Sequence, residues 1–375
     1  VVDPWVLDRE LREWSELTGE EPEGARLFIS ERASVILQFH RLYDSADTLV
    51  GTTGRGSGPA YRDRAESVGI RFVDIPQILS NPDEASSIAK RMNMQLDTVG
   101  ISDRVDPQQL LSELAWVIER FSSAIRPTGP MLDSALKEGA NVLLEGAQGA
   151  MLDIDQVTYP VVTSSVTCRA NATHGSGIHP GHISQCLGIT KAYTTRVGNG
   201  PFPTELSLTE GPGKQMSAVG HEFGTTTGRP RRTGWLDLVA LKESQRLNGY
   251  TGLVVTKLDV LGGLDELKIC TAYELDGETI GHLPASADSL SRCVPIYETL
   301  PGFPALEDGE WIEMAKASRE GGGIESLPED IRGYLARVEE LTGVPVVSVG
   351  VGPDRLASIA RTGGPFDVQL SEVTF

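Results

Sequence analysis

The sequence predicts an α/β fold with a large, mostly parallel sheet flanked by helices. Segments with helical periodicity alternate along the chain with short apolar runs, as in α/β proteins. Three of these runs end in a polar or glycine-rich loop, where such proteins bind ligands, and they are residues 141–145, 252–256 and 345–349. No Pro/Ser-rich linker divides the 375 residues, so we expect one domain over residues 1–375 with helical and small antiparallel insertions.

Helices in the first part of the chain have recognisable boundaries. Asp3 is placed to cap a helix that has Pro4 at its first position and runs to about Thr18. The glycine-rich run Gly51–Pro59 predicts a loop whose backbone can approach a ligand closely. Further helices are expected at residues 33–43, 84–96, 107–123 and 131–138, and a short strand at residues 26–30.

The second part of the chain predicts a hairpin and three more helices. Residues 268–273 and 278–282 alternate polar and apolar side chains, which predicts antiparallel strands around the Asp276-Gly277 turn. The expected helices are residues 182–193, 235–246 and about 328–341, the last capped by Ser326.

A loop rich in threonine, glycine and arginine, residues 224–235, stands out in an acidic chain of net charge −19. Guanidinium groups match carboxylate or phosphate oxygens two at a time, and threonine hydroxyls and exposed backbone N–H groups add donors. Pro230 restricts the loop, and the helix expected at residues 235–246 would place it at a positive helix end. The pattern favours binding of a small anion, with a solvated basic turn as the equal alternative from composition alone.

Bulk composition limits the class of protein. A net charge of −19 and a pI near 4.8 disfavour nucleic acid as a partner and fit a cytoplasmic enzyme. No apolar run approaches the roughly 20 residues of a membrane span, and no signal peptide is recognisable. The cysteines are widely spaced without a C-x-x-C pair, so we expect them to be reduced and mostly buried, and they are Cys168, Cys186, Cys270 and Cys293.

Lys257-Leu258-Asp259, directly after an apolar run, predicts a base-binding site. A carboxylate at a strand end can accept from both N1–H and the exocyclic amine of guanine, while the lysine stem packs along the ring. An ordinary surface ion pair is the commoner meaning of such a triplet. A guanine nucleotide also needs a phosphate loop, and the usual G-x-x-x-x-G-K-[ST] pattern does not occur in this sequence.

Several further motifs, taken in order, carry a resemblance to one family. They are residues 51–59, 145–149, 152–155, 158–160, 163–165, 195–198, 200–205, 224–235, 256–259, 296–299 and 352–355. In this order and near this spacing they resemble adenylosuccinate synthetase over almost the whole chain. The resemblance implies a P-loop-NTPase-like fold and a cytoplasmic, homodimeric ligase of purine biosynthesis. Such a ligase joins IMP to L-aspartate with GTP and Mg²⁺, through transfer of the γ-phosphoryl group to O6 of IMP and displacement by the aspartate amine.

The resemblance also implies site residues. For IMP they are Thr53, Arg55, Gln148, Thr163, Val197 and Arg229. For aspartate they are Thr225, Thr226, Thr227, Gly228, Arg229, Pro230 and Arg231. For GTP they are Arg231, Lys257, Leu258, Asp259, Gly350, Val351 and Gly352. Taken singly, Thr163, Val197 and Gly350 are more commonly ordinary turn or core residues.

Other candidate residues have a more ordinary interpretation. Asp153 and Asp155 have no third metal ligand in view, so we expect structural hydrogen bonds instead. No cysteine or carboxylate completes a zinc site around the histidines, which are His174, His179 and His182. Cys168 has no neighbouring base in the sequence that would make it a nucleophile.

Three departures from the family pattern shape the expectations. The family's amino-terminal segment, with its phosphate loop, catalytic Asp and His and Mg²⁺ ligands, has no counterpart here, so we expect missing sheet strands, no catalytic or metal-binding residue, and no ligase activity of this chain alone. Ser67 stands where the family supplies an arginine to the neighbouring subunit, with Arg62 or Arg64 as substitutes, and Gly350 replaces a hydroxyl residue. The alternatives are a non-catalytic nucleotide-binding remnant and a sister ligase acting on another purine nucleotide such as dGMP.

Overall fold

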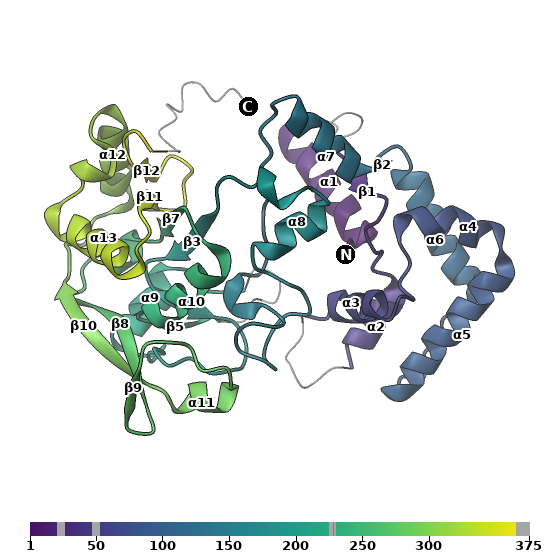
Figure 1. Ribbon diagram of the computed structural model, residues 1–375, viewed down its shortest axis with the longest axis horizontal. Helices are drawn as coiled ribbons and strands as arrows, with labels where there is room; N and C mark the ends of the chain where they lie inside the picture. The colour runs from purple at the N-terminus through teal and green to yellow at the C-terminus, as the bar shows by residue number, and fades with distance from the viewer. Residues whose placement is uncertain (21–26, 47–52, 225–227, 229, 365–375) are drawn as a thin grey trace. The chain divides into compact units, whose positions relative to one another are not determined.

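The computed structural model describes residues 1–20, 27–46, 53–224, 228 and 230–364 (Figure 1). Their contacts form two compact units. The first unit comprises Val1–Gln148 and Val162–His182, and the second comprises Gly149–Val161 and Ile183–Phe375. The expectation of a single domain over the chain stays a prediction.

The first unit is mainly helical. Its helices are α1 (Pro4–Thr18), α2 (Gln38–Asp44), α3 (Ser57–Ala65), α4 (Ile75–Ser80), α5 (Pro82–Thr98), α6 (Pro107–Phe121), α7 (Thr128–Lys137) and α8 (Ala170–Ser176). A short parallel pair joins β1 (Ile29–Ser30) to β2 (Ile125–Arg126). The Asp3 carboxylate accepts from the N–H groups of Trp5 and Val6 at 3.1 Å each, so the predicted cap of α1 is confirmed. Buried apolar side chains of α4, α5 and α6 supply much of one core.

Three sequence predictions in this unit need correction. The helix expected from Ala33 begins at Gln38, because Val35–Leu37 are buried and extended and Val35 bridges to Val2. The expected glycine loop ends at Gly56, where α3 begins at Ser57 with Pro59 in its first turn, a position that tolerates proline. Residues 141–145 form no strand in the described structure: Leu143 is 88% exposed, and none of the described strands pairs with this run.

A four-stranded sheet forms the centre of the second unit (Figure 1). Its order is β12 (Ser358–Ala360), β11 (Val346–Gly350), β7 (Gly252–Thr256) and β3 (Leu187–Lys191). The last three strands are parallel and β12 is antiparallel to β11. Leu253, Val255 and Val349 are fully or almost fully buried, as expected of a parallel sheet covered on both faces. The prediction of an α/β fold with a mostly parallel sheet is confirmed.

A second sheet of this unit has the order β10 (Val294–Pro301), β8 (Glu266–Leu275) and β6 (Leu236–Asp237), with β9 (Glu278–Ile280) also paired to β8. β8 and β9 are antiparallel around Asp276 and Gly277, whose φ angles are 52° and 87°. Two successive positive φ angles define a tight hairpin turn, so the predicted hairpin is confirmed. A further antiparallel pair joins β4 (Thr194–Arg196) to β5 (Arg232–Gly234).

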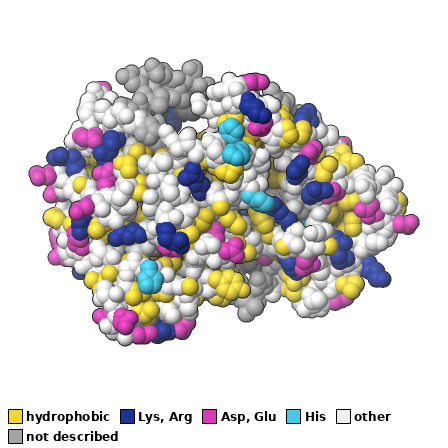
Figure 2. Space-filling view, viewed as in Figure 1, with side chains coloured by type: hydrophobic (Ala, Val, Ile, Leu, Met, Phe, Trp, Pro, Cys, Tyr) yellow, Lys and Arg dark blue, Asp and Glu magenta, His cyan; other side chains and the backbone are white. Residues whose placement is uncertain are grey.

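The helices of the second unit are α9 (Gly211–Val219), α10 (Leu238–Asn248), α11 (Ala287–Arg292), α12 (Asp308–Glu320) and α13 (Glu329–Thr342). Among the described helices, none has the length and apolar character that crossing a bilayer requires. Acidic and basic side chains are interspersed over the face of the protein shown in Figure 2.

Three further predictions were wrong in this part of the chain. The helix expected at residues 182–193 is instead β3, because pairing with β7 in a buried sheet outweighs local helical preference. The helix expected from Trp235 begins at Leu238, capped by Asp237, so the last part of the arginine loop forms β5, and β6 separates the loop from the start of α10. Ser326 does not cap α13, whose N-cap is Pro328; its hydroxyl instead lies within hydrogen-bond distance of Ser318 Oγ and the Gly323 carbonyl.

Candidate functional site

The predicted guanine residues lie together at the carboxyl ends of two neighbouring parallel strands. β7 ends at Thr256 and β11 ends at Gly350. The Leu258 N–H donates to the Gly350 carbonyl at 3.1 Å, which joins the two strand ends. Segments 257–259 and 350–352, distant in sequence, therefore form one edge of the sheet, as the sequence predicts for a ligand site.

Not all of these residues present a side chain at this edge. Leu258 and Val351 are fully buried in the core, and their N–H groups donate to Gly350 and to Ala357. Any contact they make with a ligand would use the backbone. Lys257 has a φ of 59°, a left-handed conformation uncommon for a residue with a side chain, which often marks a functional loop.

Positively charged side chains surround a buried carboxylate, Glu222, beside this edge. Lys191 Nζ lies 2.7 and 2.8 Å from its two oxygens, and the Tyr193 hydroxyl donates to it at 2.6 Å. Arg231 Nη1 donates to the same carboxylate at 3.0 Å, and Lys257 Nζ forms an ion pair with it at 3.4 Å. Glu222 thus links one residue predicted for aspartate and GTP to another predicted for guanine.

The electrostatics of this cluster follow from its partners. Burial alone would raise the pKa of Glu222, but hydrogen bonds from Lys191, Tyr193 and Arg231 outweigh it and lower that pKa to about 2. Burial lowers the pKa of Lys191, and nearby Arg231 and Lys257 act in the same direction against the pull of Glu222. Burial and the Glu222 carboxylate raise the pKa of Tyr193, which therefore remains a neutral donor.

Sequence reasoning missed Glu222, Lys191 and Tyr193. Glu222 lies just before the arginine loop, and an acidic residue beside clustered arginines is a signal that could have been used. Lys191 and Tyr193 gave no such signal, because they reach Glu222 only through the fold: Lys191 ends β3 and Tyr193 follows it.

The arginine loop is closed at its base by backbone contacts. Phe223 and Pro230 form an antiparallel bridge, and the Arg231 N–H donates to the Glu222 carbonyl at 2.8 Å. Within the loop, the Gly228 N–H donates to the Gly224 carbonyl at 2.7 Å. The remaining predicted aspartate residues, Thr225, Thr226, Thr227 and Arg229, lie outside the described residues.

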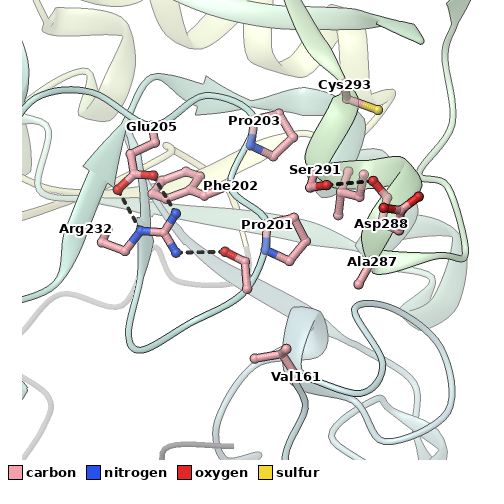
Figure 3. A pocket seen from close by; sticks show the side chains of 12 residues that line it. Val161, Pro201, Phe202, Pro203, Glu205, Arg232, Ala287, Asp288, Ser291 and Cys293 are labelled. Carbon is pink, nitrogen blue, oxygen red and sulfur yellow. Dashed lines mark hydrogen bonds and ion pairs between the residues drawn. The ribbon is translucent and has the colours of Figure 1, made fainter. Parts of the chain in front are cut away.

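Arg232, next to Arg231, binds a different carboxylate. Its guanidinium pairs with both oxygens of Glu205, lies over the Phe202 ring, and donates to the Gly200 carbonyl at 2.8 Å. Arg232 and Glu205 point toward each other beside a cavity of about 610 Å³ in the second unit (Figure 3). The motif Gly200–Glu205 is therefore packed around Arg232. Of these two arginines, only Arg231 faces Glu222.

The residues predicted for IMP are divided between the units. Thr53, Arg55, Gln148 and Thr163 belong to the first unit, and Val197 belongs to the second. Within the first unit α3 lies against Ser164, next to Thr163, because a Cβ atom at Gly58 would be 3.1 Å from Ser164 Oγ. Gln148, with a φ of 58°, is exposed, so its amide is presented rather than packed. Val197 is also exposed.

Comparison with known proteins decides the family. A profile of adenylosuccinate synthetase matches residues 1–359. The chain belongs to the adenylosuccinate synthetase family. Members of this family are GTP-dependent ligases that join IMP to L-aspartate in purine biosynthesis, and the chain is a ligase of that kind.

Individual relatives support the assignment. The adenylosuccinate synthetase of Desulfatibacillum aliphaticivorans is 45% identical over 361 residues, which are 95% of this chain and 81% of the relative. That of Myxococcus xanthus is 45% identical over 370 residues, again 95% and 81%. The fully ligated enzyme from Plasmodium falciparum has a TM-score of 0.83 at 32% identity, covering 96% of this chain and 83% of that one.

A cyanophage S-2L succinoaminodeoxyadenylate synthetase, solved with dGMP and dATP, has a TM-score of 0.53 at 17% identity. It covers 99% of this chain and 76% of that one, and at this identity the similarity shows a shared fold alone. These comparisons give no support to the expectations of a missing amino-terminal segment or of an inactive chain, and both stay predictions.

The structure gives no fit for the Mg²⁺ that the family implies. Within the described ranges, no group of three or more His, Cys, Asp or Glu side chains could hold a metal ion. Asp153 is buried and accepts from the Asp155 N–H at 3.0 Å, so the prediction of a structural hydrogen bond is confirmed for this pair. We therefore assign no metal ligand among the residues that the structure describes.

The remaining candidates have contacts of their own. The cysteines are free, and all but Cys186 are buried, as predicted. Arg64 lies 3.2 Å from His174 Nε2, and Arg62 lies over the Tyr43 ring and pairs with Asp63. Ser67 is exposed.

Proposed function

We propose that this chain binds the guanine of GTP between residues 257–259 and 350–352. The observation that carries the proposal is the hydrogen bond from Leu258 to Gly350, which brings both segments to one sheet edge. Asp259 would accept from the paired donors of guanine, and the Lys257 stem would pack along the ring. Gly350 and Gly352 would offer backbone to the base.

We assign the L-aspartate substrate to residues 225–231 of the arginine loop. Arg231 supports this assignment, because its guanidinium is held on Glu222 and its side chain is still 26% exposed. A planar guanidinium in a fixed position suits a dicarboxylic amino acid or a phosphate oxygen. In phosphoryl transfer, such fixed positive groups position the reactants and offset the developing negative charge.

IMP is assigned to Thr53, Arg55, Gln148, Thr163, Val197 and Arg229. The contact between Gly58, at the start of α3, and Ser164, next to Thr163, supports the grouping in the first unit. We further propose that the enzyme is a cytoplasmic homodimer and that Mg²⁺ accompanies GTP, with no described residue assigned to the metal.

The test measures binding and turnover by the chain as it exists. Calorimetry would compare GTP with ATP and IMP with dGMP, and an assay with IMP, GTP and L-aspartate would measure adenylosuccinate formation. We expect GTP and IMP to bind more tightly than ATP and dGMP by at least about tenfold, the effect of one well-placed polar contact. A preference for dGMP would favour the sister ligase, and binding without preference would contradict the proposal.

A control variant links the outcome to the named residues. Asp259→Ala should abolish the preference for GTP over ATP, whereas Glu278→Ala, at an exposed position of β9, should leave it unchanged. Turnover in the same samples tests the separate expectation that this chain alone has no ligase activity.

A further inference from the structure

Glu222 carries a buried charge, and it has no part in the ligand contacts proposed above. It is 0% exposed, yet its three cationic partners keep exposed side chains, at 22% for Lys191, 26% for Arg231 and 33% for Lys257. Buried ion pairs are often replaceable by apolar residues without loss of stability. A buried carboxylate whose partners reach the surface is therefore better explained by what it does to those partners.

One side of Glu222 fixes the arginine loop. Its backbone carbonyl accepts from the Arg231 N–H at 2.8 Å, and its carboxylate accepts from the Arg231 guanidinium at 3.0 Å. The neighbouring bridge between Phe223 and Pro230 continues this pairing into the loop. Backbone and side chain of Glu222 thus set both the base of the loop and the direction of Arg231.

The other side of Glu222 fixes the end of β7. Lys257 Nζ lies 3.4 Å from the carboxylate and also donates to the Gly220 carbonyl. Lys191, from the end of the neighbouring strand β3, holds both carboxylate oxygens and donates to Thr195 at 2.9 Å. The carboxylate is thus held by two strand ends as well as by the loop.

We propose that Glu222 is a positioning residue that sets Arg231 for L-aspartate and Lys257 for guanine in one shared arrangement. The inference rests on the proposed function of those two residues. Three cations around one carboxylate also leave surplus positive charge for anionic ligands. Loss of the carboxylate would then have two separable effects: more positive charge, and a displaced arginine and lysine.

The test compares wild type with Glu222→Gln by calorimetry of GTP, ATP and IMP, and of L-aspartate in the presence of IMP. Surplus charge strengthens both triphosphates alike, so the ratio of the ATP and GTP dissociation constants reports how well the segment 257–259, which Glu222 holds through Lys257, is placed for guanine. We expect this ratio to fall about tenfold, the aspartate dissociation constant to rise about tenfold, and the IMP dissociation constant to change less than twofold.

The matched control is Asp237→Asn, another buried carboxylate-to-amide change in the same unit. Asp237 caps α10 and accepts from the Tyr273 hydroxyl at 2.6 Å, so its loss should lower stability and leave the nucleotide ratio unchanged. If Glu222→Gln does not fold, Glu222→Asp keeps the charge but is too short to hold every partner, and a threefold fall in the ratio is expected. A ratio and an aspartate affinity equal to wild type in the folded variant would overturn the inference. Wild type without preference for GTP over ATP would instead contradict the proposed function.

Discussion

Leu258 donates its backbone N–H to the carbonyl of Gly350 at 3.1 Å. This single bond extends the pairing of β7 and β11 beyond their last ladder residues. It places Asp259, a partly exposed residue, on the same edge as Gly350, which ends β11, and Gly352, which follows it. Two segments that are distant in sequence therefore form one candidate pocket for the base, and the predictions for nucleotide binding depend on this pocket.

Asp259 should determine the preference for guanine. In the proposed pocket its carboxylate accepts two donors of the base, N1–H and the exocyclic amine. Inosine triphosphate lacks the amine, so wild type should bind GTP more tightly than ITP. Asp259→Asn presents a donor to the base in place of one acceptor, and we expect GTP affinity to fall about tenfold or more with a much smaller loss for ITP. Calorimetry with both nucleotides checks this, and equal losses would argue against base contact.

Gly350 should tolerate a side chain, in contrast to Gly302. A Cβ atom at Gly350 would lie 3.5 Å from Thr256 Cα, an ordinary van der Waals contact, whereas one at Gly302 would lie 1.6 Å from the Leu264 carbonyl oxygen. Gly350→Ser should therefore change the free energy of unfolding by less than about 0.5 kcal/mol. Gly302→Ala should destabilise by about 1–3 kcal/mol, since the backbone has to move. Denaturant unfolding of both variants measures the difference, and a large loss for Gly350→Ser would contradict the geometry.

Local signals in the sequence predicted part of the fold. Asp3 before Pro4 predicts the start of α1, and the Asp276-Gly277 turn predicts the β8–β9 hairpin, because caps and tight turns depend on neighbouring residues. β3 was predicted as a helix, since its apolar residues fit either period until the pairing with β7 is known. The partner of a strand in a sheet is distant in sequence, so the residues of the strand itself do not reveal the pairing.

The residues of the candidate site also fall into two groups: those that a local sequence pattern predicts, and those that only the fold brings to the site. Lys257 and Asp259 were found because they directly follow an apolar run, and Arg231 because arginines cluster around it. No local sequence pattern marks Lys191, because its role depends on the ion pair with Glu222, which forms only in the folded chain. The run at residues 141–145 shows the reverse: an apolar pattern predicts a strand, but a strand also needs a neighbour, and its Leu143 is exposed.

Glu113 should make the first unit less stable at high pH. Burial raises the pKa of this carboxyl to about 7, against a hydrogen bond from the Gln38 backbone and the charge of Arg41. The folded state thus binds a proton more tightly than the unfolded state, whose value is near 4.5, so stability falls as pH rises from about 4.5 through 7. Glu113→Gln should remove this dependence and stabilise by about 1–2 kcal/mol at pH 8, with little effect near pH 4.

The control for Glu113 lies on the same helix. Glu119 is an exposed residue of α6, so Glu119→Gln makes the same chemical change without the burial. Denaturant unfolding at pH 4, 6 and 8 should show a pH-dependent gain for Glu113→Gln alone. A gain of equal size in both variants would point to net charge instead, because the chain already carries −19.

Glu222 should stabilise the second unit most above pH 4.5. Its donors hold the folded pKa at about 2, below the unfolded value of 4.5, so its contribution is complete above 4.5 and is lost as pH falls toward 2. Glu222→Gln should therefore lower the free energy of unfolding by about 2–3 kcal/mol at neutral pH. This gap between the variant and wild type should close as pH falls from about 4.5 to 2. Unfolding measured against pH for wild type, Glu222→Gln and Glu278→Gln, at an exposed position, tests this. A gap that stayed constant with pH would mean that the carboxylate stabilises through packing, since packing does not titrate, whereas the ion pairs with Lys191 and Arg231 require a charged partner.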